Sequence, residues 1–93
     1  MKFNRGETVI CSCTVKNSSG TLVDPSTSMK ITITDNRNGV EVNDDNMIDD
    51  AGLGAYHYDW LTTSTHAKGI YFVFYKATDG TRVSIVKDSL ELE

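Results

Sequence analysis

A two-residue alternation of apolar and polar side chains runs through most of this chain and constrains its fold more than any other feature. In the segment 7–16, ETVICSCTVK, one face of an extended chain carries Val9, Cys11, Cys13 and Val15. In the segment 28–35, SMKITITD, one face carries Met29, Ile31 and Ile33. Such alternation is typical of antiparallel strands with one buried face. No window of a dozen residues keeps apolar residues at helical spacing, so the sequence predicts an all-β fold.

Turn-forming residues separate further strands. Asn38-Gly39 predicts a hairpin turn into a short strand at 40–42, and Asp79-Gly80 predicts another between the run 69–77 and a last strand at about 82–92. Between them, two glycines precede an expected strand at 55–61 that carries Tyr56, Tyr58 and Trp60 on one face. Six or seven strands with turns at short, regular spacing predict a two-sheet antiparallel β-sandwich.

Length and charge restrict the classes of partner. A chain of 93 residues is expected to form one domain, spanning 1–93, although Leu92-Glu93 is also compatible with a cloning remnant on a piece of a longer protein. The formal charge is −4, with 9 basic and 13 acidic residues and no basic stripe, which disfavours nucleic acid as a partner. No apolar run approaches the roughly 20 residues of a membrane span, so no membrane insertion is expected.

The cysteines and histidines do not form a recognisable catalytic or metal motif. Cys11 and Cys13 are two residues apart on one strand face, where a disulfide between them is disfavoured. A thiolate metal site would need His57 and His66 in addition, and His57 alternates to the face opposite the aromatic side chains. We therefore expect core thiols, no cofactor and no catalytic role, with metal binding and redox pairing as less favoured alternatives.

Four aspartates crowd one short stretch. Asp44, Asp45, Asp49 and Asp50 fit a solvated acidic loop, and they are also candidate calcium ligands because calcium takes six to eight oxygens. The alternative function that they suggest is calcium-dependent binding of a carbohydrate or protein by the loop 44–50.

The run GIYFVFYKA at 69–77 is apolar on both faces. If Tyr71, Val73 and Tyr75 point into the core, then Ile70, Phe72 and Phe74 point outward. Either the aliphatic stems of Lys30, Lys76 and neighbouring strands cover these rings, or the rings contact a protein partner or a neighbouring domain.

Much of the chain resembles a known family. The tract 49–80, DDAGLGAYHYDWLTTSTHAKGIYFVFYKATDG, resembles the Asp, Gly-x-Gly-x-Tyr and Gly-x-Tyr-x-Val-x-Tyr pattern of filamin-type and macroglobulin-type immunoglobulin-like repeats. The segments 3–25 and 87–92 resemble the opening and closing strands of these repeats. The resemblance implies an immunoglobulin-like sandwich, here with no inter-sheet disulfide because both cysteines lie on one strand.

The same resemblance implies a function. Such repeats serve as spacers and as adhesion or assembly modules, so we expect a non-catalytic structural and protein-interaction module of a larger protein. It favours an extracellular, cell-surface or viral setting, while the sequence itself leaves the compartment and the oligomeric state open.

Overall fold

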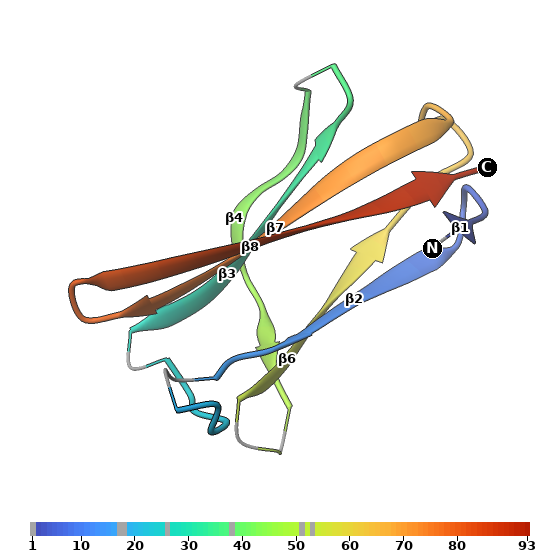
Figure 1. Ribbon diagram of the computed structural model, residues 1–93. Helices are drawn as coiled ribbons and strands as arrows, with labels where there is room; N and C mark the ends of the chain where they lie inside the picture. The colour runs from blue at the N-terminus through green and yellow to red at the C-terminus, as the bar shows by residue number, and fades with distance from the viewer. Residues whose placement is uncertain (1, 17–18, 26, 38, 51, 53) are drawn as a thin grey trace.

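The computed structural model describes residues 2–16, 19–25, 27–37, 39–50, 52 and 54–93, and these residues form strands and turns but no helix (Figure 1). Among them, no helix has the length and apolar character to cross a membrane. Asn38, half of the first predicted hairpin turn, lies outside the described residues. The strands are β1 (Lys2–Phe3), β2 (Thr8–Thr14), β3 (Ser28–Asp35), β4 (Val40–Asn46), β5 (Ile48–Asp49), β6 (Ala55–Leu61), β7 (Gly69–Asp79) and β8 (Arg82–Leu92).

The strands form two sheets. One has the order β1-β8-β7-β3-β4 and the other has the order β2-β6-β5. Figure 1 shows them as two layers, with β7 and β8 in one and β2 and β6 in the other. The predicted all-β class and the two sheets are confirmed.

Two details of the prediction are wrong. The described residues form eight strands instead of six or seven, because β1 and β5, of two residues each, also pair. The sheets are not wholly antiparallel, because Lys2 and Phe3 pair in parallel with Glu91 and Leu92 of β8. A two-residue strand is too short to show alternation, so neither could be predicted from periodicity.

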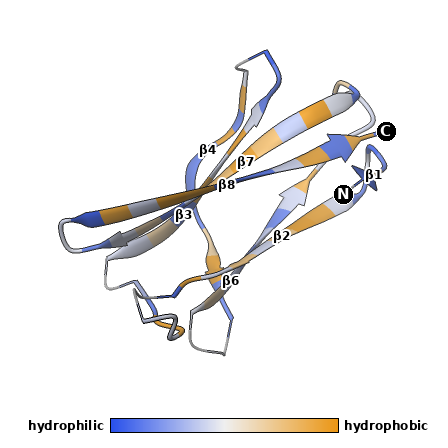
Figure 2. Cartoon of the chain, in the orientation of Figure 1, coloured by the Kyte–Doolittle hydropathy of each residue, from blue (hydrophilic) through white to orange (hydrophobic). Residues whose placement is uncertain are grey.

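The core lies between the sheets and consists of the side chains that alternate inward. Bands of hydrophobic and hydrophilic residues follow one another along β7 and β8 (Figure 2). The predicted inward sets of β2, β3 and β7 are confirmed, except that Cys13 and Val15 are only partly buried at the rim. The buried core consists of Val9, Cys11, Met29, Ile31, Ile33, Val42, Met47, Tyr56, Trp60, Tyr71, Val73, Tyr75, Leu90 and Leu92.

One lateral side of the sandwich is closed by the chain itself. The ladder between β3 and β4 shifts register between Ile31 and Ile33, and Asp44 there has a positive φ of 52°. Beyond this bulge the chain passes from one sheet to the other, with Met47 buried at the crossing and its N–H donating to the Met29 carbonyl at 3.0 Å. The bulge re-aims β4 so that it covers this side of the core.

The opposite side, formed by β2 and β8, is closed only in part. Among the residues that the structure describes, β2 pairs with β6 alone, and β8 pairs with β1 only at Glu91 and Leu92. Within the described residues, the outer edge of β8 from Arg82 to Leu90 therefore has no neighbouring strand.

Gly54 explains the glycines before the aromatic strand. Its φ is +73°, and an added Cβ would lie 2.7 Å from the Val15 carbonyl oxygen. Its N–H donates to the Asp24 carboxylate at 2.7 Å, and its carbonyl accepts from the Val15 N–H at 2.8 Å. Only glycine combines this conformation with so close an approach of the backbone.

Candidate functional site

The predicted contact residues share one surface. Ile70, Phe72 and Phe74 alternate on β7 with the buried Tyr71 and Val73, so they lie on the outer face of the five-stranded sheet. Phe72 and Phe74 are half-buried, whereas Ile70 is 38% exposed. The structure thus brings together all three side chains that the sequence placed outward.

The ammonium group that lies over the two rings comes from a neighbouring strand, one of the covers expected from the sequence. Lys87 of β8 lies opposite Phe74, and its Nζ is 4.4 Å from the Phe72 centroid and 5.8 Å from the Phe74 centroid. Both distances are within the range of a cation–π interaction. Lys76 instead forms an ion pair with Asp44 at 3.1 Å.

The sequence analysis missed two further members of this surface. Val83 and Ile85 of β8 lie opposite Thr78 and Lys76, on the same outer side as Phe74, and are 56% and 61% exposed. The turn residues are Gly80 and Thr81, because Asp79 still pairs with Arg82, so the predicted Asp79-Gly80 turn lies one residue too early and gives a shifted register. Either turn places Val83 and Ile85 on the outer side, so a sequence indication of the face did exist. We call the set of Ile70, Phe72, Phe74, Val83 and Ile85 the outer apolar face.

The acidic stretch is not a loop, which corrects that expectation. Asp44 and Asp45 belong to β4 and Asp49 belongs to β5, while Asp50 directly follows β5. A strand alternates its side chains and the bulge at Asp44 rotates them further, so neighbouring carboxylates point to different places.

Three of these carboxylates have separate partners. Asp44 pairs with Lys76 on the outer face, and Asp45 accepts a hydrogen bond of 2.7 Å from the Tyr58 hydroxyl of the facing sheet. Asp50 Oδ1 lies 2.5 Å from His57 Nδ1. Within the ranges that the structure describes, no group of three or more His, Cys, Asp or Glu side chains is placed to hold a metal ion.

The thiols and the nearest histidine lie on opposite faces of the smaller sheet. Cys11 lies opposite Tyr58 and Cys13 opposite Tyr56, so the thiols share the inner face with the aromatic rings, as predicted. His57 alternates outward with Asp59, whose carboxylate is 3.9 Å from its Nε2. No cysteine is therefore within hydrogen-bond reach of this imidazole.

Burial also makes the thiols poor nucleophiles. Removal from water raises the pKa of Cys11 and of Cys13 to about 11. For Cys11, a hydrogen bond with Tyr75 lowers the pKa and the nearby Asp88 carboxylate raises it, and both effects are smaller than that of burial. Because the thiolate is the reactive form, both cysteines are unreactive near neutral pH.

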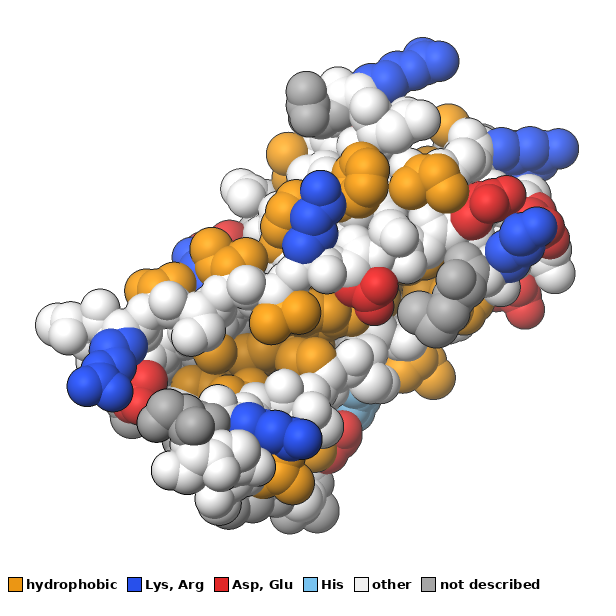
Figure 3. All heavy atoms as spheres, viewed as in Figure 1, with side chains coloured by type: hydrophobic (Ala, Val, Ile, Leu, Met, Phe, Trp, Pro, Cys, Tyr) orange, Lys and Arg blue, Asp and Glu red, His pale blue; other side chains and the backbone are white. Residues whose placement is uncertain are grey.

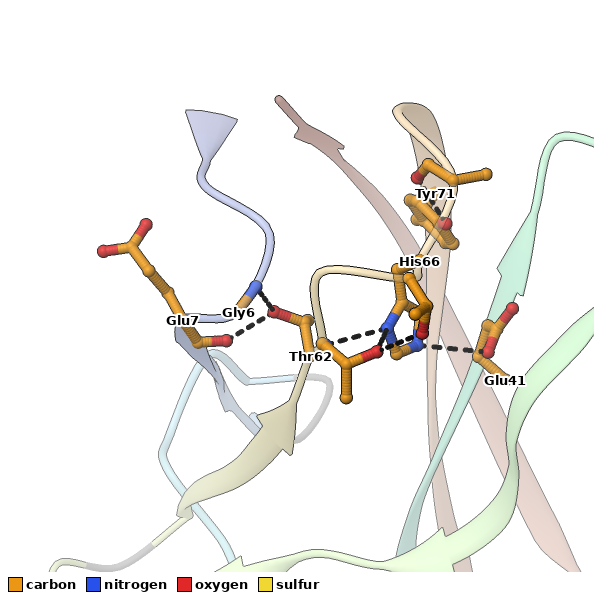
Figure 4. A network of polar contacts seen from close by, with 9 residues as sticks. Gly6, Glu7, Glu41, Thr62, His66 and Tyr71 are labelled. Atoms are coloured by element: carbon orange, nitrogen blue, oxygen red, sulfur yellow. Dashed lines mark hydrogen bonds and ion pairs between the residues drawn. The ribbon is translucent and has the colours of Figure 1, made fainter.

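His66 belongs to a polar network at one end of the sandwich (Figure 4). Its Nδ1 accepts from the Thr63 N–H at 2.9 Å, its Nε2 lies 3.4 Å from Glu41, and its ring stands edge-on to Trp60 with centroids 5.5 Å apart. Tyr71 packs on the same Trp60 at 5.3 Å. Sequence reasoning considered His66 as a metal ligand, whereas these contacts anchor the segment 62–68 to the core.

A hollow opens on the β2 and β8 side. It encloses about 130 Å³, and the space-filling view shows hydrophobic side chains on its floor (Figure 3). A second hollow of about 210 Å³ shares four of its lining residues and continues it toward the Gly80-Thr81 turn. We call the two together the β8 groove. Its shared residues are Val15, Lys16, Ala77 and Ser84.

The comparisons with known proteins found no relative. No protein-family model, no curated protein and no solved structure matches this chain. The candidate surfaces are therefore interpreted from their geometry alone.

Proposed function

We propose that this chain is an immunoglobulin-like structural module of a larger assembly, which acts as a spacer and protein-contact domain and has no catalytic role. The observation that carries the proposal is the outer apolar face, which lies on the larger sheet and takes no part in the core between the layers. Apolar side chains gathered on one outer sheet face favour a protein contact.

The order of the strands supports the immunoglobulin-like assignment. In variable-type immunoglobulin domains, strands G, F, C and C′ are neighbours in one sheet and B, E and D in the other. Assigning β2 to β8 in chain order to B, C, C′, D, E, F and G gives the orders β8-β7-β3-β4 and β2-β6-β5. Eight strands, a parallel pair and the lack of cysteines on facing strands are departures from the antibody type.

A tyrosine near the start of β7 gives a second argument. The Tyr71 hydroxyl donates to the Ala67 carbonyl at 2.7 Å, four residues upstream. A tyrosine at the start of strand F that bonds back to the backbone in this way is a hallmark of immunoglobulin-like sandwiches. The Gly-x-Tyr pattern at 69–71 thus acquires a physical role at the corner between the sheets.

We propose a neighbouring copy of the same module as the occupant of the outer apolar face. The outer side of the smaller sheet carries exposed Ile10, Ile48 and Leu61 together with Asp50 and Asp59. The outer apolar face is bordered by three lysines, Lys30, Lys76 and Lys87, against the carboxylates of Asp44 and Glu91. The two surfaces are complementary in charge and both are apolar, and complementary patches on opposite sides of a module generate head-to-tail stacking.

Sedimentation velocity over a range of protein concentrations tests this function. The expected result is an average mass that rises with concentration, falls with added salt, and stays monomeric in the double variant Val83→Ser with Ile85→Ser. The double variant Ile10→Ser with Leu61→Ser should also stay monomeric, because it alters the opposite contact surface. Leu22→Ser, an exposed position on neither surface, is the matched control and should associate normally. A wild-type protein that remains monomeric throughout would overturn the stacking contact.

A further inference from the structure

One apolar side chain of the inner face is not covered. Val86 and Leu90 both point toward the core side of β8, because they lie opposite the buried Tyr75 and Tyr71 of β7. Leu90 is 3% exposed, whereas Val86 is 61% exposed. The difference coincides with the end of β1, which pairs with β8 only at Glu91 and Leu92.

The β8 groove lies along the part of β8 that β1 does not cover. One wall is the inner side of the β7–β8 hairpin, with Ala77, Ser84 and Val86, and the other is the end of β2 with the residues that follow it, from Cys13 to Lys16. The partly buried Cys13 and the buried Tyr75 also line it, so the groove reaches the core itself (Figure 3). An apolar side chain that enters here would contact existing core residues.

The backbone on both sides of the groove is available for pairing along β8 and along β2 as far as Thr14. Beyond β2, Lys16 bridges to Leu22 and the Val15 carbonyl accepts from the Val23 N–H at 3.0 Å, so the segment with Val23 and Pro25 bounds this end of the groove. The edge of β8 from Arg82 to Leu90 and the outer edge of β2 have no neighbouring strand among the described residues. Unpaired edges of this kind present N–H and C=O groups that can form a ladder with another chain. Since β2 and β8 run in opposite directions on this side (Figure 1), a strand between them that is parallel to β8 is antiparallel to β2.

The two ends of the groove carry charges of opposite sign. Lys16 and Arg82 lie at the end near the Gly80-Thr81 turn, beside Asp79, and the structure gives neither cation an ion pair with another described residue. Asp88 lies on the same inner side toward the other end, close enough to Cys11 to affect the pKa of that thiol. An occupant is favoured if it carries an acidic residue beside Arg82 and a basic residue beside Asp88.

We infer that the β8 groove accepts an extended strand from a protein partner, added in parallel to β8 in continuation of β1. Its inward positions take an acidic residue beside Arg82, apolar residues beside Ser84 and Val86, and a basic residue beside Asp88. The inference rests on the proposed function as a protein-contact module, but it concerns a different surface from the outer apolar face.

A peptide titration followed by amide chemical shifts tests the inference. The probe is the blocked synthetic peptide Glu-Thr-Val-Thr-Val-Thr-Lys, whose alternate residues match the four inward positions in parallel register. We expect saturable shifts at Ser84 to Asp88 and at Cys11 to Lys16, and clearly weaker binding of Lys-Thr-Val-Thr-Val-Thr-Glu, which has the same composition with the end charges exchanged.

Two neighbouring positions provide matched variants. Val86 and Ile85 are both 61% exposed, on opposite faces of β8, so lysine at either position should leave the fold intact. Val86→Lys should raise the peptide Kd by at least about tenfold, as expected for a side chain central to the contact, and Ile85→Lys should leave it unchanged.

The other outcomes are distinguishable from failure of the proposed function. Loss of peptide binding in Ile85→Lys but not in Val86→Lys would overturn the groove and favour the outer apolar face. Shifts at Ser84 to Asp88 that depend on protein concentration and not on peptide would overturn the partner strand in favour of β8 pairing between two copies. Absence of saturable shifts with either peptide would also overturn the inference, whereas the stacking contact is tested by sedimentation alone.

Discussion

Val86 and Leu90 lie on the same side of the same strand, and only Leu90 is covered. Lysine at the two positions should therefore have very different effects on stability. Val86→Lys should change the free energy of unfolding by less than about 0.5 kcal/mol, since its side chain already contacts water. Leu90→Lys should cost about 3 kcal/mol or more, because it places a charge in the core. Urea denaturation of both variants measures the difference, and equal losses would mean that the groove is closed in solution.

Stability should fall in alkali because several core groups bind their protons more tightly in the folded protein. Burial raises the pKa of Cys13 from 9.0 to about 11, and the hydrogen bond to Asp45, followed by burial, raises the pKa of Tyr58 from 10.0 to about 12. A raised pKa in the folded state stabilises the protein below the unfolded pKa, and this stabilisation is lost as the pH rises through the folded value. Stability should thus begin to decline near pH 9 and continue to decline to about pH 12.

Two variants separate these contributions. Cys13→Ala should flatten the decline between about pH 9 and 11, and Tyr58→Phe should flatten it between about pH 10 and 12. Urea midpoints measured at half-unit steps of pH give the slopes. If both variants keep the wild-type slope, these groups are not responsible for the alkaline loss.

Gly54 should be intolerant of any side chain. Gly54→Ala should destabilise the protein by about 2 kcal/mol or more, because it combines a left-handed backbone with a contact of 2.7 Å to the Val15 carbonyl oxygen. Gly80→Ala is the control, since Gly80 has a similar φ of +64° but nothing within 4 Å of an added Cβ. The difference in thermal stability between the two variants measures the cost of the contact with the Val15 carbonyl. Equal destabilisation of both variants would show that this contact contributes nothing.

Calcium should have no effect on the folded protein. The carboxylates of Asp44, Asp45 and Asp50 contact Lys76, Tyr58 and His57 separately, so they do not converge on one cation. A ligand that binds only the folded state must raise its stability. Millimolar calcium added to chelated protein should therefore leave the Tm unchanged, and a rise that saturates with calcium would restore the calcium-dependent function.

The alternation of side chains predicted the class of fold and the inward faces because it depends only on local geometry. It placed Tyr71, Val73 and Tyr75 in the core and Phe72 and Phe74 outside. The same reasoning failed at the acidic stretch, since a positive φ at a non-glycine residue, Asp44, creates a bulge that nothing in the local pattern indicates. The faces of β4 beyond the bulge were unpredictable for that reason.

The surroundings of the candidate surfaces depend on contacts between residues that are distant in the sequence. The position of the Lys87 ammonium over the two rings follows from the hairpin register, with turn residues Gly80 and Thr81. The predicted turn at Asp79-Gly80 would instead have placed Ile85 opposite Phe74. The exposure of Val86 depends instead on how far β1 extends along β8. The length of that pairing cannot be predicted from the alternation of apolar and polar residues. Sequence thus located the outer apolar face in part and gave no indication of the β8 groove.

Hydrogen exchange of the backbone amides of β8, resolved residue by residue, tests most directly the claim that this module presents an open strand edge for protein contact. The account predicts that protected and unprotected amides alternate from Val83 to Leu90, because only the groups facing β7 are paired, while protection is continuous along β7 between its two neighbours. Uniform protection along β8 in the monomeric protein would contradict the account.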